Sequence, residues 1–263
     1  MTRPFAVPAR LTLALFMALS MAVSMAAAQQ RVRFEVEMNS WDPDLTGQMK
    51  IVEGGIGDSI DLIDDLAMTG DRANDLRITF HPSGRTEIRL ARMPIAYTGD
   101  NVASRTIEFA GETFTVSSRV VSNIDLDYVR AGFAWQFLSS DDRRFRAGPL
   151  LEIKGFQGDA SLGAPDLGAP VAVGETFEVA YPAVGIAVDL EPSERLHFFG
   201  EASTLVGTDV GDQTDFEVGV RVPLWGALTA QAGYRSITID VTDKDDAVKF
   251  DMDSVFIGLG LRF

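Results

Sequence analysis

Large apolar residues occur at every second position along most of this chain, which is the spacing of a β-strand with one apolar face. The clearest segment is TDFEVGVRV (214–222), in which four large apolar side chains alternate with glutamate, glycine and arginine. The last nine residues, VFIGLGLRF (255–263), alternate in the same way. After residue 28 we find no amphipathic helical segment of convincing length. This pattern predicts an all-β protein.

The alternating segments divide into ten predicted strands joined by connections of two kinds. The predicted strands span residues 31–41, 74–82, 85–97, 118–137, 144–156, 176–190, 195–206, 214–224, 227–241 and 247–263. Short turns are predicted at 81–84, 139–143, 191–194 and 223–226. They alternate with acidic or Gly/Pro-rich connections at 42–73, 98–117, 157–175, 207–213 and 242–246. Alternating short and long connections favour a closed antiparallel up-and-down barrel, with eight strands as the alternative if two hairpins decorate the loops.

The faces opposite the apolar ones carry charges of both signs. The candidates for an internal charge network are Arg33, Glu35, Arg77, Glu87, Arg89, Arg130, Glu201, Glu217, Arg221, Arg235 and Arg262, with Glu37, Arg144, Arg146, Glu152 and Lys154 beside them. A soluble sandwich could not bury so many charges, because each would need a partner to offset its desolvation. A narrow barrel can pair them across its lumen while its apolar faces contact lipid. Aromatic residues near strand ends are then predicted to form interfacial girdles: Trp41, Tyr97, Trp135, Tyr181, Trp225 and Phe263.

Two predicted strands change the parity of their apolar residues partway along. In the third strand, the apolar residues move from even positions (Ile88, Leu90) to odd ones (Met93, Ile95). The last strand shows the same change just before Val255. We interpret these changes as β-bulges, with misplaced strand boundaries as the alternative.

The N-terminus has the pattern of a secretory signal peptide. Two arginines precede an apolar run at 11–23, and Ala26-x-Ala28 provides a cleavage site, so we predict a signal peptide at 1–28 and a barrel at 29–263. The full chain has a net charge of −15, and removal of two arginines with the signal peptide makes it −17. This acidic balance argues against nucleic acid as a partner. The chain has no cysteine and hence no disulfide framework.

The ending VFIGLGLRF resembles the C-terminal sorting signal of Gram-negative outer-membrane barrels, with Val255, Ile257, Leu259, Leu261 and Phe263 as the assembly signal. Residues 31–263 resemble the small outer-membrane β-barrel proteins, of which OmpA-type domains are familiar members. The segments DSIDLIDDL (58–66) and NDLRITFHPSGR (74–85) are similar to an uncharacterised subgroup. The resemblance implies a monomer in the cell outer membrane, in contact with lipid and lipopolysaccharide, and recognised by the barrel-assembly machinery during biogenesis. It implies no activity and no cofactor.

Two histidine-containing sites are candidates for catalysis. His81-Pro82-Ser83 has the His-x-Ser spacing of lipid A deacylases, but it lies in a predicted turn at the end opposite the long loops. His197 begins a strand at that same end, so we interpret it as pairing with Glu201 or an arginine in the lumen rather than as an omptin-type catalytic residue. With two histidines and no cysteine, nucleophilic catalysis has few candidates.

Acidic connections are the candidates for a metal site. Asp58, Asp61, Asp64 and Asp65 lie in the first, and Asp243, Asp245 and Asp246 lie in the last. Such carboxylates could bind Ca²⁺ or Mg²⁺, but neither set matches an EF-hand, so we interpret them as solvated surface loops. The leading prediction is therefore a structural or surface-exposed barrel without catalysis, cofactor or metal. A narrow channel for small solutes is the alternative, and an enzyme acting on lipid A or peptides is third.

Overall fold

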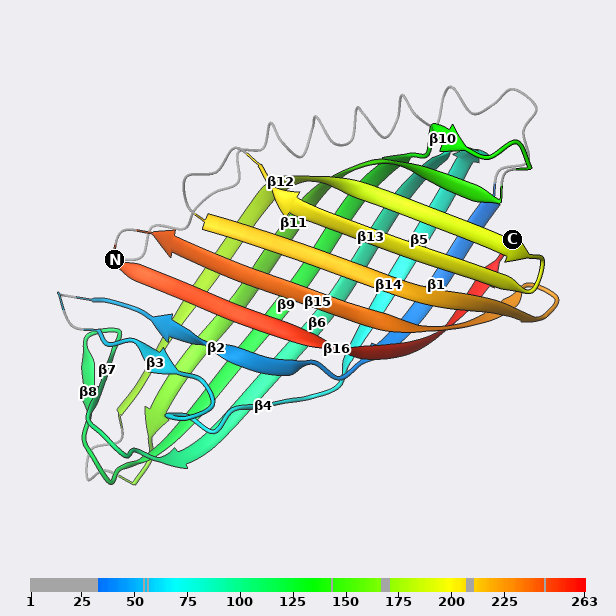
Figure 1. The fold of residues 1–263 in the computed structure, drawn as a ribbon. Helices are drawn as coiled ribbons and strands as arrows, with labels where there is room; N and C mark the ends of the chain where they lie inside the picture. Colours follow the sequence, from blue (N-terminus) through cyan, green and yellow to red (C-terminus); the bar gives the residue numbers. More distant parts are fainter. Residues whose placement is uncertain are drawn as a thin grey trace.

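The computed structural model describes residues 33–53, 55, 57–142, 144–166, 171–206, 211–243 and 245–263, so the predicted signal peptide lies outside the described residues. Ten long strands form one closed antiparallel barrel, in which β1 pairs with β16 to complete the circle (Figure 1). These strands are β1 (Arg33–Trp41), β5 (Ala73–Ser83), β6 (Thr86–Val102), β9 (Arg119–Trp135), β11 (Phe145–Ala164), β12 (Val171–Ser193), β13 (Leu196–Leu205), β14 (Gly211–Trp225), β15 (Leu228–Asp243) and β16 (Asp246–Arg262). The predicted all-β fold and the ten predicted strands are confirmed. No helix in the described part of the chain is long and apolar enough to cross a membrane.

In the connections that the structure describes, there are six short strands. They are β2 (Asp44–Lys50), β3 (Ile60–Asp61), β4 (Thr69–Gly70), β7 (Ile107–Phe109), β8 (Glu112–Phe114) and β10 (Leu138–Ser139). We call the end of the barrel that carries the tight β5–β6, β12–β13 and β14–β15 turns the turn end, and the opposite end the loop end. The predicted loop at 157–175 is wrong for most of its length, because β11 and β12 stay paired from Phe145↔Leu190 to Ala164↔Val171.

The predicted bulges in the third and last long strands are also wrong. Strand β6 pairs with β9 without interruption from Thr86↔Trp135 to Val102↔Arg119. Strand β16 pairs with β15 without interruption along its length. Along each of these strands, the same alternate positions point into the barrel throughout. What changes is which of the two faces carries the apolar residues. On β6, the outward row passes from Leu90 to the exposed Arg92.

This change divides the barrel into two halves. In the turn half, the outward side chains are apolar and exposed: Phe34, Val36, Met38, Leu76, Ile78, Leu90, Val129, Phe133, Leu151, Val184, Ile186, Phe198, Phe216, Val218, Val255, Ile257, Leu259 and Leu261. In the loop half, the inward side chains are apolar and buried, including Trp41, Met93, Ile95, Tyr97, Ile124, Leu126, Phe156, Ile237, Phe250, Met252 and Phe256. Outward positions of the loop half are instead polar, as Asn123 and Asp125 on β9 show.

The connection after β1 fills the opening of the loop half. Beyond the Trp41↔Ala73 pair, where β5 begins, β2 continues along β16, while β6 continues on the other side of a gap in the sheet and pairs with β4. Residues 58–68 cross this gap, and Leu62 and Leu66 from this segment join the apolar core. The β7–β8 hairpin adds four more core side chains: Ile107, Phe109, Ala110 and Phe114. The loop half is therefore closed by a packed core rather than by loose loops.

The six aromatic residues predicted to form girdles differ in whether their side chains point into the barrel or out of it. Trp41 and Tyr97, each only 1% exposed, occupy inward positions in the core, so their prediction as girdle residues is wrong. Trp135, Trp225 and Phe263 are exposed at the turn end. Tyr181 on β12 is half-buried.

Candidate functional site in the barrel interior

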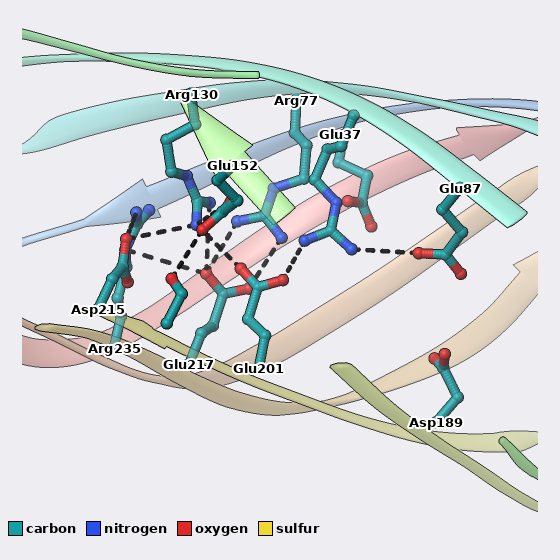
Figure 2. A network of polar contacts seen from close by, with 12 residues as sticks. Glu37, Arg77, Glu87, Arg130, Glu152, Asp189, Glu201, Asp215, Glu217 and Arg235 are labelled. Carbon is teal, nitrogen blue, oxygen red and sulfur yellow. Dashed lines mark hydrogen bonds and ion pairs between the residues drawn. The ribbon is translucent and has the colours of Figure 1, made fainter. Parts of the chain in front are cut away.

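A layer of buried charged side chains crosses the middle of the barrel (Figure 2). Arg77 on β5 donates two hydrogen bonds to Glu217 on β14, at 2.9 and 2.8 Å, and a third to Asp75 at 2.9 Å. Arg235 on β15 donates to Asp75 and to Asp215, both at 3.1 Å. Strands β5 and β14 are not neighbours in the sheet, so these pairs join opposite walls of the barrel.

Further ion pairs extend this layer to the remaining wall. Arg130 on β9 donates to Glu201 on β13 at 2.9 Å, and Arg89 on β6 donates to the same carboxylate. Lys154 on β11 is fully buried, with its Nζ atom 3.6 Å from Glu152. Side chains from both walls thus meet in the lumen and fill it.

Cations and carboxylates are equally represented in this layer. The members are Arg77, Arg89, Arg130, Lys154 and Arg235 with Asp75, Glu152, Glu201, Asp215 and Glu217. Each buried charge has an oppositely charged neighbour, which offsets the several kcal/mol that desolvation of an isolated ion costs. Removing one member would leave its partner as an uncompensated buried charge, so the layer is expected to hold the two walls in one arrangement.

A second charged layer lies closer to the turn end. Arg221 on β14 contacts two carboxylates of β1: it donates a hydrogen bond to Glu37, and its Nη1 atom is 3.4 Å from Glu35. Arg262 on β16 donates to both oxygens of Glu35, at 3.1 and 3.2 Å. Gln136 donates to Glu87 at 3.2 Å.

The two histidines belong to this second layer. His197 Nδ1 lies 3.4 Å from Arg221 Nη1, so an arginine lies beside the ring, as the sequence predicts as one of two alternatives. The carboxylate beside the ring is Asp189 rather than Glu201, with His197 Nε2 2.7 Å from Asp189 Oδ1. His81 lies between Glu35 and Glu87, at 3.7 and 3.8 Å.

The His-x-Ser pair is located where β5 ends. Ser83 Oγ donates to Thr86 Oγ1 at 3.0 Å across the β5–β6 turn. His81 faces the carboxylates of the second charged layer instead. This motif is thus at the turn end, where the sequence places it.

The structure brings ten of the eleven predicted network residues into ion pairs inside the barrel: Glu35, Arg77, Glu87, Arg89, Arg130, Glu201, Glu217, Arg221, Arg235 and Arg262. Arg33 is exposed at the turn-end rim and forms no ion pair with the described residues. Arg144 lies outside the lumen in a turn, 3.3 Å from Asp142. Sequence reasoning missed Asp75, Asp189 and Asp215, although each lies on the inward parity of its strand and a complete parity count would include it.

An aromatic floor separates the charged layers from the apolar core. Tyr128 donates from its hydroxyl group to Asp215 at 2.8 Å, while its ring stacks on Phe156 with centroids 4.4 Å apart. The guanidinium of Arg235 lies 5.6 Å from the ring of Tyr128 and 5.6 Å from that of Trp41. Beyond this floor the interior is occupied by buried apolar side chains. A path along the barrel axis would therefore meet two obstructions of different chemistry.

A cavity of about 250 Å³ is enclosed by residues of the second charged layer, on the turn-end side of the first. Its rim includes Arg33, Ser83 and Arg262, which lie at strand ends, and Gly84 in the β5–β6 turn, so it opens at the turn end. Its deeper wall includes Arg77, Glu37, Arg89, Glu87, Gln136, Arg146, Asp189, Glu191, His81, His197, Glu201 and Arg221. We call this space the turn-end cavity.

The acidic residues proposed for metal binding are used within the loop-end structure. Asp65 pairs with Arg105 at 2.6 Å, and Asp61 accepts hydrogen bonds from the backbone N–H groups of residues 63 and 64, both at 2.9 Å. Asp58 accepts from the N–H of Glu108 at 3.1 Å. Burial alone would raise the pKa of Asp65, but the hydrogen bond and charge of Arg105 outweigh it and lower the pKa.

These contacts correct the interpretation of the first acidic segment as a simple solvated loop, because Asp65 is buried and fastens residues 58–68 to the rest of the molecule. Asp246 likewise accepts from the N–H of Val52 at 2.7 Å, whereas Asp64 and Asp245 are exposed. The side chain of Asp243 lies outside the described residues. In the ranges that the structure covers, no three His, Asp or Glu side chains are grouped to hold a metal ion.

No protein-family model and no curated protein matches this sequence. Among solved structures, the outer-membrane protease OmpT of Escherichia coli is 8% identical, with a TM-score of 0.47 over 90% of this chain and 99% of that one. The attachment invasion locus protein Ail of Yersinia pestis is 11% identical, with a TM-score of 0.38 over 89% and 100%. The translocator domain of the autotransporter NalP of Neisseria meningitidis is 12% identical, with a TM-score of 0.39 over 97% of each chain.

Likeness at this level carries no argument about activity, and the fold rests on the strand pairing of this chain itself. That pairing closes ten antiparallel strands, with an apolar outer belt and a charged interior in the turn half. The chain is a ten-stranded β-barrel with the architecture of outer-membrane barrels, as the resemblance of its sequence predicted.

Proposed function

We propose that this chain is an integral outer-membrane barrel that presents its loop half at the cell surface, conducts no solute and catalyses no reaction. The proposal rests on one observation: along the same strands, the outward face is apolar and the inward face charged in the turn half, whereas the outward face is polar and the inward face apolar in the loop half. Apolar outward rows suit lipid, whereas polar outward rows around an apolar core suit water. The boundary between the halves is then the outer surface of the membrane.

The outer belt of the turn half supports insertion in a bilayer. Along β16 and the residue that follows it, outward apolar residues extend from Val255 to Phe263 without interruption. Eight residues of strand cover about 27 Å, or about 21 Å along the membrane normal at a tilt of about 40°, close to the apolar band of about 25 Å in such barrels. In water, a continuous exposed apolar surface of this kind would drive aggregation.

The orientation follows from the connections. Tight turns of outer-membrane barrels face the periplasm and longer connections face outward, so the turn end is assigned to the periplasm. The predicted signal peptide and assembly signal support the same route, with the barrel-assembly machinery as the partner during biogenesis. Lipid and lipopolysaccharide are the partners of the finished barrel, which is proposed to be a monomer.

Obstruction of the lumen favours a closed barrel over the narrow channel that is the second candidate. The charged layers pair opposite walls, and the apolar core excludes water and ions beyond them. In planar bilayers, purified protein should give no conductance steps above the background of protein-free bilayers, with a porin as the positive control. Steady openings that change in Arg221→Ala would establish the channel instead.

The location has its own test. In unboiled electrophoresis of the outer-membrane fraction, the folded barrel should run as a heat-modifiable band, because a closed sheet resists detergent until it is boiled. Recovery of the chain in the soluble periplasm would contradict the assignment.

A further inference from the structure

Among the described residues, the turn-end cavity has more free hydrogen-bond donors than free acceptors in its wall. Its volume of about 250 Å³ is enough for about eight water molecules at about 30 Å³ each, and hence for a small organic or inorganic solute. Arginines, carboxylates and both histidines line it. Which of these groups already have partners therefore decides what it can bind.

The carboxylates of the wall are already engaged by donors. Glu35 accepts hydrogen bonds from Arg262, Glu37 from Arg221, and Glu87 from Gln136. Glu191 accepts from Arg146, Glu201 accepts from both Arg89 and Arg130, and Asp189 lies against the ring of His197. A cation entering the cavity would have to displace one of these partners. The wall is thus poorly suited to capture a cation.

Several donors, in contrast, have capacity to spare. The Nε atoms of Arg89 and Arg146 are buried and lack a hydrogen-bond acceptor among the described residues. Arg33, at the rim, has no ion-pair partner in the described chain, and its guanidinium carries five donors. These Nε atoms have almost no accessible surface of their own, but the side chains of Arg89 and Arg146 are 15% and 21% exposed and line the cavity. An acceptor in the cavity therefore meets the two guanidinium groups, and a small rotation of either one brings its unpaired N–H to that acceptor, which is favoured because a buried donor without an acceptor is destabilising.

We propose that the turn-end cavity binds a small oxyanion, with a phosphate or carboxylate group directed at Arg146 and Arg89 and entry past Arg33. Oxyanions form short, charge-assisted hydrogen bonds with guanidinium groups, often in pairs. Two sources could provide this chemistry: a free periplasmic anion, or the phosphate of a lipid headgroup at the rim. The site does not depend on whether the barrel conducts, since the cavity opens at the turn end and lies on the turn-end side of the first charged layer.

The test is titration calorimetry of folded, full-length mature protein in detergent with inorganic phosphate, compared with chloride at equal ionic strength. We expect saturable binding of phosphate with one site per chain and no saturable binding of chloride. Arg146→Gln and Arg33→Gln should each weaken phosphate binding at least tenfold. Arg33 is exposed, so its substitution tests the site without disturbing the buried layers.

The matched control is Arg92→Gln. Arg92 is a well-exposed arginine on the outer face of β6, held by Asp127 at 2.7 to 3.0 Å and remote from the cavity lining. Its substitution should leave phosphate binding unchanged. Heat-modifiability of each variant shows that the barrel is folded.

Glycerol 3-phosphate distinguishes the two sources. Tighter binding than inorganic phosphate assigns a lipid headgroup, and equal or weaker binding assigns a free anion. The proposal is overturned if phosphate gives no saturable binding, or if folded Arg146→Gln and Arg33→Gln bind it as well as the unaltered protein.

Discussion

The turn half and the loop half of this barrel share the same ten strands and the same inward parity, yet their interiors are opposites. Around Glu217 the interior is ionic, and around Phe156 it is apolar. Their outer faces also differ: the turn half, with its ionic interior, has apolar outward residues such as Val218, and the loop half, with its apolar interior, has polar ones such as Asn123. A strand's inward face is therefore defined by the closed sheet, whereas the chemistry of each face follows the medium that surrounds it.

The largest effect is expected from breaking the ionic interior. Glu217→Ala should lower the free energy of unfolding by about 3–5 kcal/mol, because Arg77 would remain buried without its principal partner. Urea unfolding in lipid vesicles measures this. The double variant Arg77→Ala/Glu217→Ala should lose less than the sum of the two single losses, and strict additivity would show that the pair is not coupled.

A core truncation in the loop half should act more locally. Leu66→Ala removes a buried side chain from the segment 58–68 and should cost about 2–5 kcal/mol in the packing of that segment. We expect faster proteolysis within residues 58–68 while the barrel stays heat-modifiable. Loss of the heat-modifiable band would instead show that the two halves unfold as one unit.

The outer faces can be compared with one substitution at two heights. Val218→Arg should lower the free energy of unfolding in vesicles by about 2–4 kcal/mol, because a charge would face hydrocarbon near the membrane centre. Asn123→Arg, also outward and exposed but in the loop half, should change it by less than about 0.5 kcal/mol. Equal effects would contradict the assignment of the membrane boundary between the two halves.

The smallest effect concerns pH at the loop end. Because Arg105 lowers the pKa of Asp65 in the folded protein, their contact contributes stability above the unfolded pKa of about 3.9, and this contribution is lost as pH falls through the lower folded value. Hydrogen exchange of residues 58–68 should therefore increase in acid. Arg105→Gln should remove this pH-dependent step, and an unchanged acid response in that variant would show that another group is responsible.

The sequence alone determined the features that depend on local periodicity. All ten strands could be predicted from alternation, because side chains on a strand change face at every residue whatever lies next to them. The inward position of Arg77, Glu217 and Arg221 followed from the same rule. Location of the histidines at the turn end followed from counting strands.

Tertiary structure decided everything that depends on which strands meet. The changes of apolar parity near residues 91 and 254 resembled bulges, because one strand cannot show whether its apolar row faces lipid or a core. Trp41 and Tyr97 entered that core only because residues 58–68 and 107–114 fold over it. The partner of each lumen charge, such as Asp189 for His197, depended on closure of the barrel, which brings together residues far apart in the chain.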